Sequence, residues 1–190
     1  NLIEEEKVQQ VDTKIFDNSL FFAEEGIHNH LIRILEKEET DKQETEIIQE
    51  QIAIVEEELG IQYDAIQKQA ICDAIQNKVF ILTGGPGTGK TTVINGHLED
   101  YLDADFIIVD EFSMVDTWLA NQLFSNISST SKILIVGDSD QLPSVSPGQV
   151  LADLLQIPSL PQTRLERIYR QSEESTIVTL ASQIRQGILP

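Results

Sequence analysis

One eight-residue run limits the fold of this chain more than any other feature, namely Gly84-Gly85-Pro86-Gly87-Thr88-Gly89-Lys90-Thr91. The run matches G-x-x-x-x-G-K-[ST], in which glycines let the backbone N–H groups approach phosphate oxygens. It follows the short apolar run Val79–Leu82, which is typical of a strand buried on both faces of a parallel sheet. A helical stretch follows, so the sequence predicts a strand, a phosphate-binding loop and a helix rather than a glycine-rich turn that binds nothing.

Two more apolar runs, Phe106–Val109 and Ile133–Val136, resemble the first. Helical patterns lie between the runs, the clearest of them from Thr117 to Ile127. Strands that alternate with helices indicate an α/β fold with a parallel sheet.

Polar residues follow the second and third apolar runs directly. Asp110-Glu111 comes after the second run, and we expect Asp110 to hold Mg²⁺ and Glu111 to polarise an attacking water as general base. Gly137–Pro143 comes after the third run, and Gln141 within it is placed to contact a γ-phosphate or to orient the water. Taken alone, the acidic pair also fits a solvated strand end, and the later segment a plain turn. The phosphate loop upstream favours the catalytic interpretation, because ligands bind at the carboxyl ends of parallel strands.

Residues 1–60 have a different character and predict a small, acidic, mostly helical unit. A short strand is expected among Val8, Val11, Ile15 and Phe16, and a helix is expected to begin at Asn18-Ser19. A second helix is expected from Thr40-Asp41 to Gly60, followed by a third from Tyr63 to Gln76.

Charge restricts how the chain can bind nucleic acid. The sequence has 32 acidic and 13 basic residues and a net charge of −19, with −12 of it in residues 1–62. A protein that binds nucleic acid over its whole surface is expected to be basic, so any DNA contact here must be local. No stretch approaches the roughly 20 apolar residues of a membrane span, and we expect no membrane association. The single cysteine, Cys72, and the lack of a secretory pattern favour the cytoplasm.

Four segments resemble, in order, helicase motifs I to IV of superfamily 1B DNA helicases of the RecD/TraA type. They are Gly84–Thr92, Asp110–Met114, Gly137–Val145 with Pro147-Gly148, and Ile168–Gln171. The resemblance is strongest to the RecD2-like branch, also described as exodeoxyribonuclease V alpha subunit-like, and covers most of the chain. It implies a RecA-like ATP-binding lobe at residues 61–160, and the beginning of a second RecA-like lobe at 161–190.

The resemblance also implies roles for single residues. Gln67 would read the adenine edge, and Gln141 would couple the γ-phosphate to the rest of the motor. Arg170 would be an arginine finger from the second lobe, although an ordinary surface arginine is the alternative. Lys90 would bind the β- and γ-phosphates as part of catalysis, and Thr91 would ligate Mg²⁺ together with Asp110. The whole nucleotide-binding set would be Gln67, Gly84, Gly85, Pro86, Gly87, Thr88, Gly89, Lys90, Thr91 and Thr92.

The activity implied by the resemblance is ATP hydrolysis coupled to 5′→3′ translocation on single-stranded DNA. Duplex unwinding in DNA repair and recombination would follow from it. The implied cofactors are ATP and Mg²⁺, and the implied partners are single-stranded and duplex DNA. We expect a monomer, and the acidic N-terminal unit is a candidate docking surface for a protein partner.

The sequence departs from the family pattern in two places. Only 20 residues separate Lys90 from Asp110, which is too short for motif Ia, so we expect a segment to be missing near residues 101–102. Motifs V and VI do not occur before Pro190, which leaves about one and a quarter motor lobes. Residues 1–190 alone are therefore expected to bind ATP without unwinding DNA.

Two other functions remain open at this stage. One is a P-loop ATPase that remodels protein complexes, which single-stranded DNA would not stimulate. The other is a non-catalytic nucleotide-binding interaction module, in which the acidic residues dock a partner. The presence of both Glu111 and Gln141 argues against this last alternative.

Overall fold

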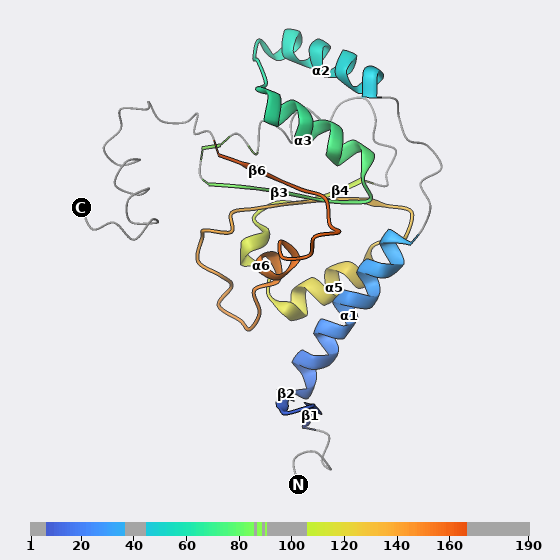
Figure 1. The fold of residues 1–190 in the computed structure, drawn as a ribbon, viewed down its shortest axis with the longest axis vertical. Helices are drawn as coiled ribbons and strands as arrows, with labels where there is room; N and C mark the ends of the chain where they lie inside the picture. The colour runs from blue at the N-terminus through green and yellow to red at the C-terminus, as the bar shows by residue number, and fades with distance from the viewer. Residues whose placement is uncertain (1–6, 37–44, 86, 89, 91–105, 167–190) are drawn as a thin grey trace, which may run out of the picture.

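A four-stranded parallel sheet forms the centre of the described part of the computed structural model, with strand order β4-β5-β3-β6 (Figure 1). The structure describes residues 7–36, 45–85, 87–88, 90 and 106–166. The strands are β3 (Val79–Gly84), β4 (Phe106–Val109), β5 (Lys132–Gly137) and β6 (Gln162–Leu165). All three predicted apolar runs are strands of this sheet, which confirms the α/β fold.

The strand β3 shows why the sheet needs a cover on both faces. All six of its residues are buried. Val79 and Ile81 belong to one core cluster, whereas Phe80 and Leu82 belong to the other. This alternation follows from the two-residue period of a strand, and it explains the continuous apolar run in the sequence.

Helices cover the two faces separately (Figure 1). One face carries α1 (Asn18–Leu35), α5 (Thr117–Asn126) and the short α6 (Val150–Leu154). The other carries α2 (Thr45–Leu59) and α3 (Ala65–Gln76). A short 3-10 helix, Phe112–Met114, follows β4 and contributes the buried Phe112 to the first core.

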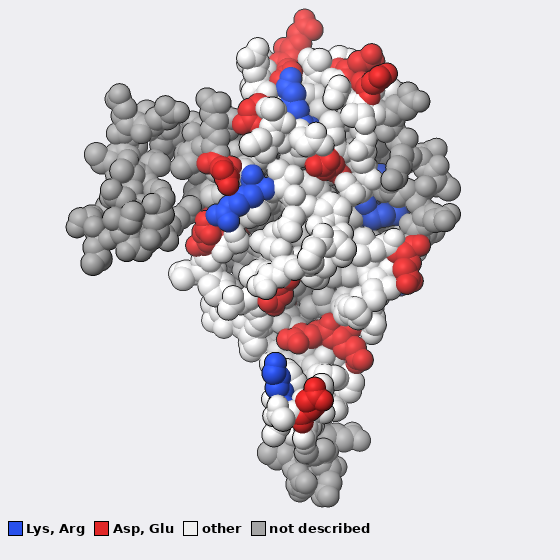
Figure 2. All heavy atoms as spheres, in the orientation of Figure 1, with Lys and Arg blue, Asp and Glu red and all other residues white. Residues whose placement is uncertain are grey.

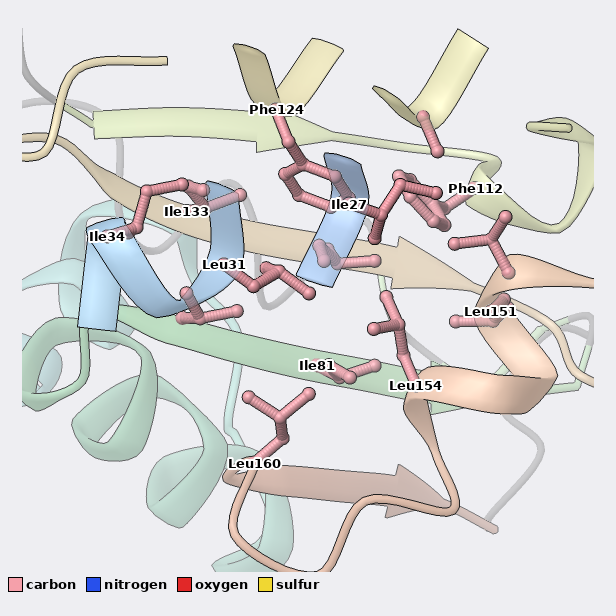
Figure 3. Close-up of a cluster of buried hydrophobic side chains, with 14 of the residues drawn as sticks. Ile27, Leu31, Ile34, Ile81, Phe112, Phe124, Ile133, Leu151, Leu154 and Leu160 are labelled. Atoms are coloured by element: carbon pink, nitrogen blue, oxygen red, sulfur yellow. The ribbon is translucent and has the colours of Figure 1, made fainter. Parts of the chain in front are cut away.

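The helix α1 is an integral part of the first core. Ile27, Leu31 and Ile34 point toward Phe124 of α5 and the sheet residue Ile133 (Figure 3). Arg33 donates to the carbonyl oxygens of Phe124 and Ile127 at 3.0 and 2.7 Å, where α5 ends. The helices α1 and α2 therefore lie on opposite faces of the sheet, and the division at residue 60 stays a prediction.

On the other face, Ile48 and Ile52 of α2 pack with α3 and with Phe80 and Leu82 of the sheet. Cys72 of α3 is only 3% exposed in this cluster. Burial raises the pKa of its thiol, because desolvation disfavours the thiolate.

The predicted single strand near the N-terminus is wrong, because the structure has a hairpin there. The strands β1 (Val8–Val11) and β2 (Lys14–Asp17) pair antiparallel across a turn at Asp12-Thr13. Asp12 adopts a left-handed conformation with φ 53°, which aspartate tolerates in turns. The two strands have only four residues each, so their local pattern is too weak to indicate the reversal.

The helix boundaries agree better with the sequence. The helix α1 begins at the predicted Asn18, where the Asp17 carboxylate accepts from the backbone N–H groups of Ser19 and Leu20. A hydrogen bond from the Ser19 hydroxyl lowers the pKa of Asp17. Gly60 ends α2 as predicted and has a φ of 63°. The predicted beginning of that helix at Thr40-Asp41 lies outside the described residues.

Replacing Gly148 by alanine is expected to destabilise the fold strongly. Its φ is +111°, and an added Cβ would lie 3.1 Å from the backbone nitrogen of Thr117 and collide with the Thr117 hydroxyl. We expect a loss of about 2–4 kcal/mol in the free energy of unfolding, measured by urea denaturation. The control is Gly60→Ala, where φ is +63° and the added Cβ meets nothing within 4 Å, so the loss should be about 1 kcal/mol. Equal losses in the two variants would contradict this explanation.

Candidate active site

The phosphate loop begins where β3 ends, and its first residue is held closely by neighbours. A Cβ added at Gly84 would lie 2.7 Å from the carbonyl oxygen of Leu165 and 2.6 Å from the Thr88 hydroxyl. Gly87 has a φ of 78°, which glycine adopts without strain. The Thr88 hydroxyl is buried and donates to the Gly85 carbonyl at 2.8 Å. Close packing therefore explains the glycine at position 84, and the backbone conformation explains the glycine at position 87.

Lys90 places its ammonium group at the entrance of this loop. Its Nζ donates to the carbonyl oxygens of Gly84 and Gly85 at 2.5 and 3.2 Å. These carbonyls lie at the carboxyl end of β3, where ligands bind in parallel sheets. The positive charge is thus close to the backbone that would surround a phosphate.

Asp110 and Glu111 follow β4 directly, and both side chains are exposed. The backbone N–H of Glu111 donates to Asp110 Oδ1 at 2.8 Å. Glu111 has a φ of 55°, a left-handed conformation that costs about 1–3 kcal/mol in a residue other than glycine. The fully buried Phe112 next to it anchors this conformation. Strained backbone of this kind is often found at functional sites.

Sheet order sets the spacing between the acidic pair and the phosphate loop. The strand β5 separates β4 from β3, so the two carboxyl ends are two strand spacings, about 10 Å, apart. A metal ion with a polyphosphate chain can span such a gap. Among the described residues, no group of three or more His, Cys, Asp or Glu side chains could hold a metal ion. Mg²⁺ normally uses one or two carboxylates together with phosphate oxygens, so a single exposed carboxylate at Asp110 fits it.

Gln141 lies on the turn that follows β5, and its side chain is exposed. Its backbone N–H donates to the Asp138 carbonyl at 3.1 Å. Asp138 is 1% exposed, and its Oδ1 accepts from the backbone N–H of Asp140 at 3.0 Å. Asp138 therefore shapes the turn that presents Gln141.

Sequence reasoning did not single out Asp138 as a site residue. Among the residues that the structure describes, its other oxygen, Oδ2, has no hydrogen-bond partner and is buried, as are the hydroxyls of Thr83 and Ser113. Thr83 lies at the end of β3 and Ser113 directly follows Phe112, so all three segments end at the same edge of the sheet. The available signal was an acidic residue just after a buried strand, the same placement that identified Asp110.

Gln67 is only 4% exposed and has a clear local role. Its backbone N–H donates to Asp64 Oδ1 at 2.8 Å, and its side-chain oxygen accepts from the Asp64 N–H at 3.0 Å. This capping box begins α3. Two residues, Asn77 and Lys78, separate α3 from β3, so the beginning of the helix lies toward the carboxyl end of that strand. Reading of adenine by Gln67 stays a prediction.

The structure thus brings Lys90, Asp110, Glu111 and Gln141 to one edge of the sheet, and their catalytic roles stay predictions. Five predicted site residues lie outside the described residues: Pro86, Gly89, Thr91, Thr92 and Arg170. The predicted missing segment near residues 101–102 lies outside them as well.

A family profile described as "AAA domain" matches residues 94–190, just over half of the chain. The chain belongs to the AAA domain family. A second profile, also described as an AAA domain, matches residues 67–105. The two matches together extend from α3 to the end of the sequence.

The chain is similar in sequence to proteins named as RecD-type helicases or helicase subunits. It is 35% identical over 104 residues to the ATP-dependent RecD2 DNA helicase of Deinococcus radiodurans, covering 55% of this chain and 14% of that protein. It is 36% identical over 104 residues to the RecBCD enzyme subunit RecD of Mycolicibacterium smegmatis, covering 54% and 18%. The resemblance to RecD-type proteins is confirmed, and the chain spans less than a fifth of the length of these two relatives.

A solved structure supports the fold of the AAA domain. Pif1 helicase from Candida albicans matches with a TM-score of 0.50 and 16% identity, covering 68% of this chain and 45% of that one. The likeness confirms an α/β P-loop fold with a parallel sheet. In the described part of the chain, no helix is long and apolar enough to cross a membrane.

Proposed function

We propose that this chain is the ATP-hydrolysing part of a 5′→3′ DNA helicase that translocates on single-stranded DNA and unwinds duplexes in DNA repair and recombination. The observation that carries the proposal is the meeting of Lys90, Asp110, Glu111 and Gln141 at the carboxyl edge of one parallel sheet. A phosphate-binding lysine, a metal-binding carboxylate and a water-orienting group are the parts that phosphoryl transfer requires. The names of the RecD relatives add DNA unwinding to this chemistry.

In this proposal each residue acts on one part of the nucleotide. Lys90 leaves the loop carbonyls and neutralises the β- and γ-phosphates, while the glycine-rich backbone surrounds them. A bound Mg²⁺, held by Asp110 and Thr91, would supply positive charge for the developing negative charge on the phosphates. Glu111 accepts a proton from the attacking water, and Gln141 orients that water or contacts the γ-phosphate. Gln67 would recognise adenine, and Arg170 would add transition-state charge from the second lobe.

DNA is expected to bind at a restricted place. Figure 2 shows basic side chains as a few separate groups on the visible face, with acidic groups distributed among them. The net charge of −19 disfavours phosphate contacts over the whole surface. We therefore propose a local contact with single-stranded DNA. A monomeric state, a cytoplasmic location and a protein partner at the acidic residues 1–60 stay predictions.

The test is ATP turnover by the full-length protein with and without single-stranded DNA. We expect DNA to raise kcat about tenfold, which corresponds to a barrier lowered by about 1.4 kcal/mol. Heparin of similar charge serves as the control for unspecific polyanion binding. Unwinding is then compared on duplexes with a 5′ or a 3′ overhang, and only the 5′ overhang should support it. ATP turnover without any response to DNA would favour a P-loop ATPase that remodels protein complexes.

A further inference from the structure

An ion pair at the carboxyl edge of the sheet joins segments that lie on the two sides of β3. It joins Arg164 of β6 to Asp140 of the turn after β5, with 2.9 Å between Arg164 Nη2 and Asp140 Oδ2. The strand β3 lies between these two strands, and Thr83 is in register with Arg164 on one side and with Gly137 on the other. The pair therefore bridges the end of β3, from which Gly84 leads into the loop.

The same pair fixes one side of the turn that carries Gln141. Asp140 is the residue before Gln141, and its backbone N–H is held by the buried carboxylate of Asp138. The Gln141 backbone N–H is held by the Asp138 carbonyl. The turn is thus held by two residues. Asp138 binds it through hydrogen bonds in the protein interior, and Arg164 binds it through the ion pair from β6, on the other side of β3.

The exposure of this pair argues against a large contribution to folding stability. The side chains of Arg164 and Asp140 are 54% and 30% exposed. Ion pairs at this exposure add little to folding stability, because water screens them. A guanidinium group is nevertheless a planar donor that fixes the direction of a carboxylate well. A small displacement of a water-orienting group is also enough to slow catalysis markedly.

We propose that Arg164 and Asp140 are positioning residues that fix Gln141 relative to the phosphate loop and thereby set the rate of ATP hydrolysis. This inference rests on the ATP hydrolysis in the proposed function. Neither side chain needs to touch the nucleotide. The strand β6 also leads into the segment that contains Arg170, so the bridge connects the Gln141 turn with the strand that precedes the predicted arginine finger.

The experiment compares four variants of the full-length protein with the wild type in ATP turnover without DNA. Two single variants, Arg164→Gln and Asp140→Asn, break the pair, and the double variant Asp140→Arg/Arg164→Asp restores it with reversed charges. The control is Arg33→Gln, which removes an arginine that links α1 to the end of α5, near the opposite edge of the sheet. Thermal unfolding is recorded for every variant.

We expect kcat to fall about two- to fivefold in each single variant, with KM for ATP changed by less than about twofold. The charge-reversed double variant should regain most of the lost kcat, and Arg33→Gln should keep wild-type kcat. Wild-type kcat in the single variants, or no recovery in the double variant, overturns the inference. A loss of kcat that only follows the folded fraction overturns it too. If the wild type hydrolyses no ATP, the proposed function fails and the inference fails with it.

Discussion

Replacing Lys90 by alanine should abolish ATP turnover in the full-length protein. The Nζ of Lys90 lies within hydrogen-bonding distance of the two carbonyls that begin the phosphate loop, so its charge is close to where phosphates would bind. Removing a group that stabilises transition-state charge typically lowers kcat by about 10²–10³-fold. Loss of ground-state phosphate binding should raise KM as well. Steady-state hydrolysis of ATP by purified wild type and variant measures both effects.

The matched control for this prediction is Lys78→Ala. Lys78 stands just before β3, at the opposite end of the strand from the loop, and donates to the carbonyls of Ser129 and Thr130. Lys78→Ala removes the same charge as Lys90→Ala but at the other end of β3, away from the phosphate loop, so kcat should stay near the wild-type value. Unchanged turnover in Lys90→Ala would show that the nucleotide site has been assigned wrongly.

Replacing Glu111 by glutamine should separate binding from hydrolysis. The exchange keeps the size of the side chain but removes the carboxylate that would accept the proton of the attacking water. Loss of a general base typically lowers kcat by about 10²–10⁴-fold. Affinity for ATP should stay within about threefold, because the charge lost is not used in ground-state binding. Single-turnover hydrolysis and equilibrium nucleotide binding measure the two quantities separately.

Asp116→Asn provides the same charge change five residues later. Asp116 caps α5 by accepting from the Leu119 N–H, and asparagine caps helices about as well as aspartate. Its kcat should equal that of the wild type. Wild-type hydrolysis in Glu111→Gln would exclude Glu111 as the base, whereas loss of ATP binding would assign it a role in the ground state.

The sequence predicted most of the sheet and the placement of the site because both leave local signals. A strand buried on two faces has a continuous apolar sequence, and β3, β4 and β5 each contain such a run. Parallel strands align their carboxyl ends, so the residues after Val109 and Gly137 could be expected at one edge. The remaining strand, β6, is an edge strand with the sequence Gln-Thr-Arg-Leu. It contains no apolar run, so the sequence did not predict it.

Other features depend on contacts that are distant in sequence. The hairpin turn at Asp12-Thr13 was missed because its flanking strands are short and their pattern is weak. The ion pair between Asp140 and Arg164 depends on β6 lying beside β3, which no local pattern specifies. The place of Asp138 just after a buried strand was a local signal, but its burial could not be read from that pattern. Topology had to be known before Arg164 could be associated with the site.

The packing of α1 against α5 also affects the order of events during synthesis. Arg33 and its acceptor Phe124 are 91 residues apart in the chain, and Ile27, Leu31 and Ile34 share the same core cluster as that later helix. A ribosome adds about 5–20 residues per second, so α5 is synthesised about 5–20 seconds after α1. The apolar side of α1 cannot pack against α5 before then. During this interval the nascent chain exposes an isoleucine- and leucine-rich surface that a chaperone can bind.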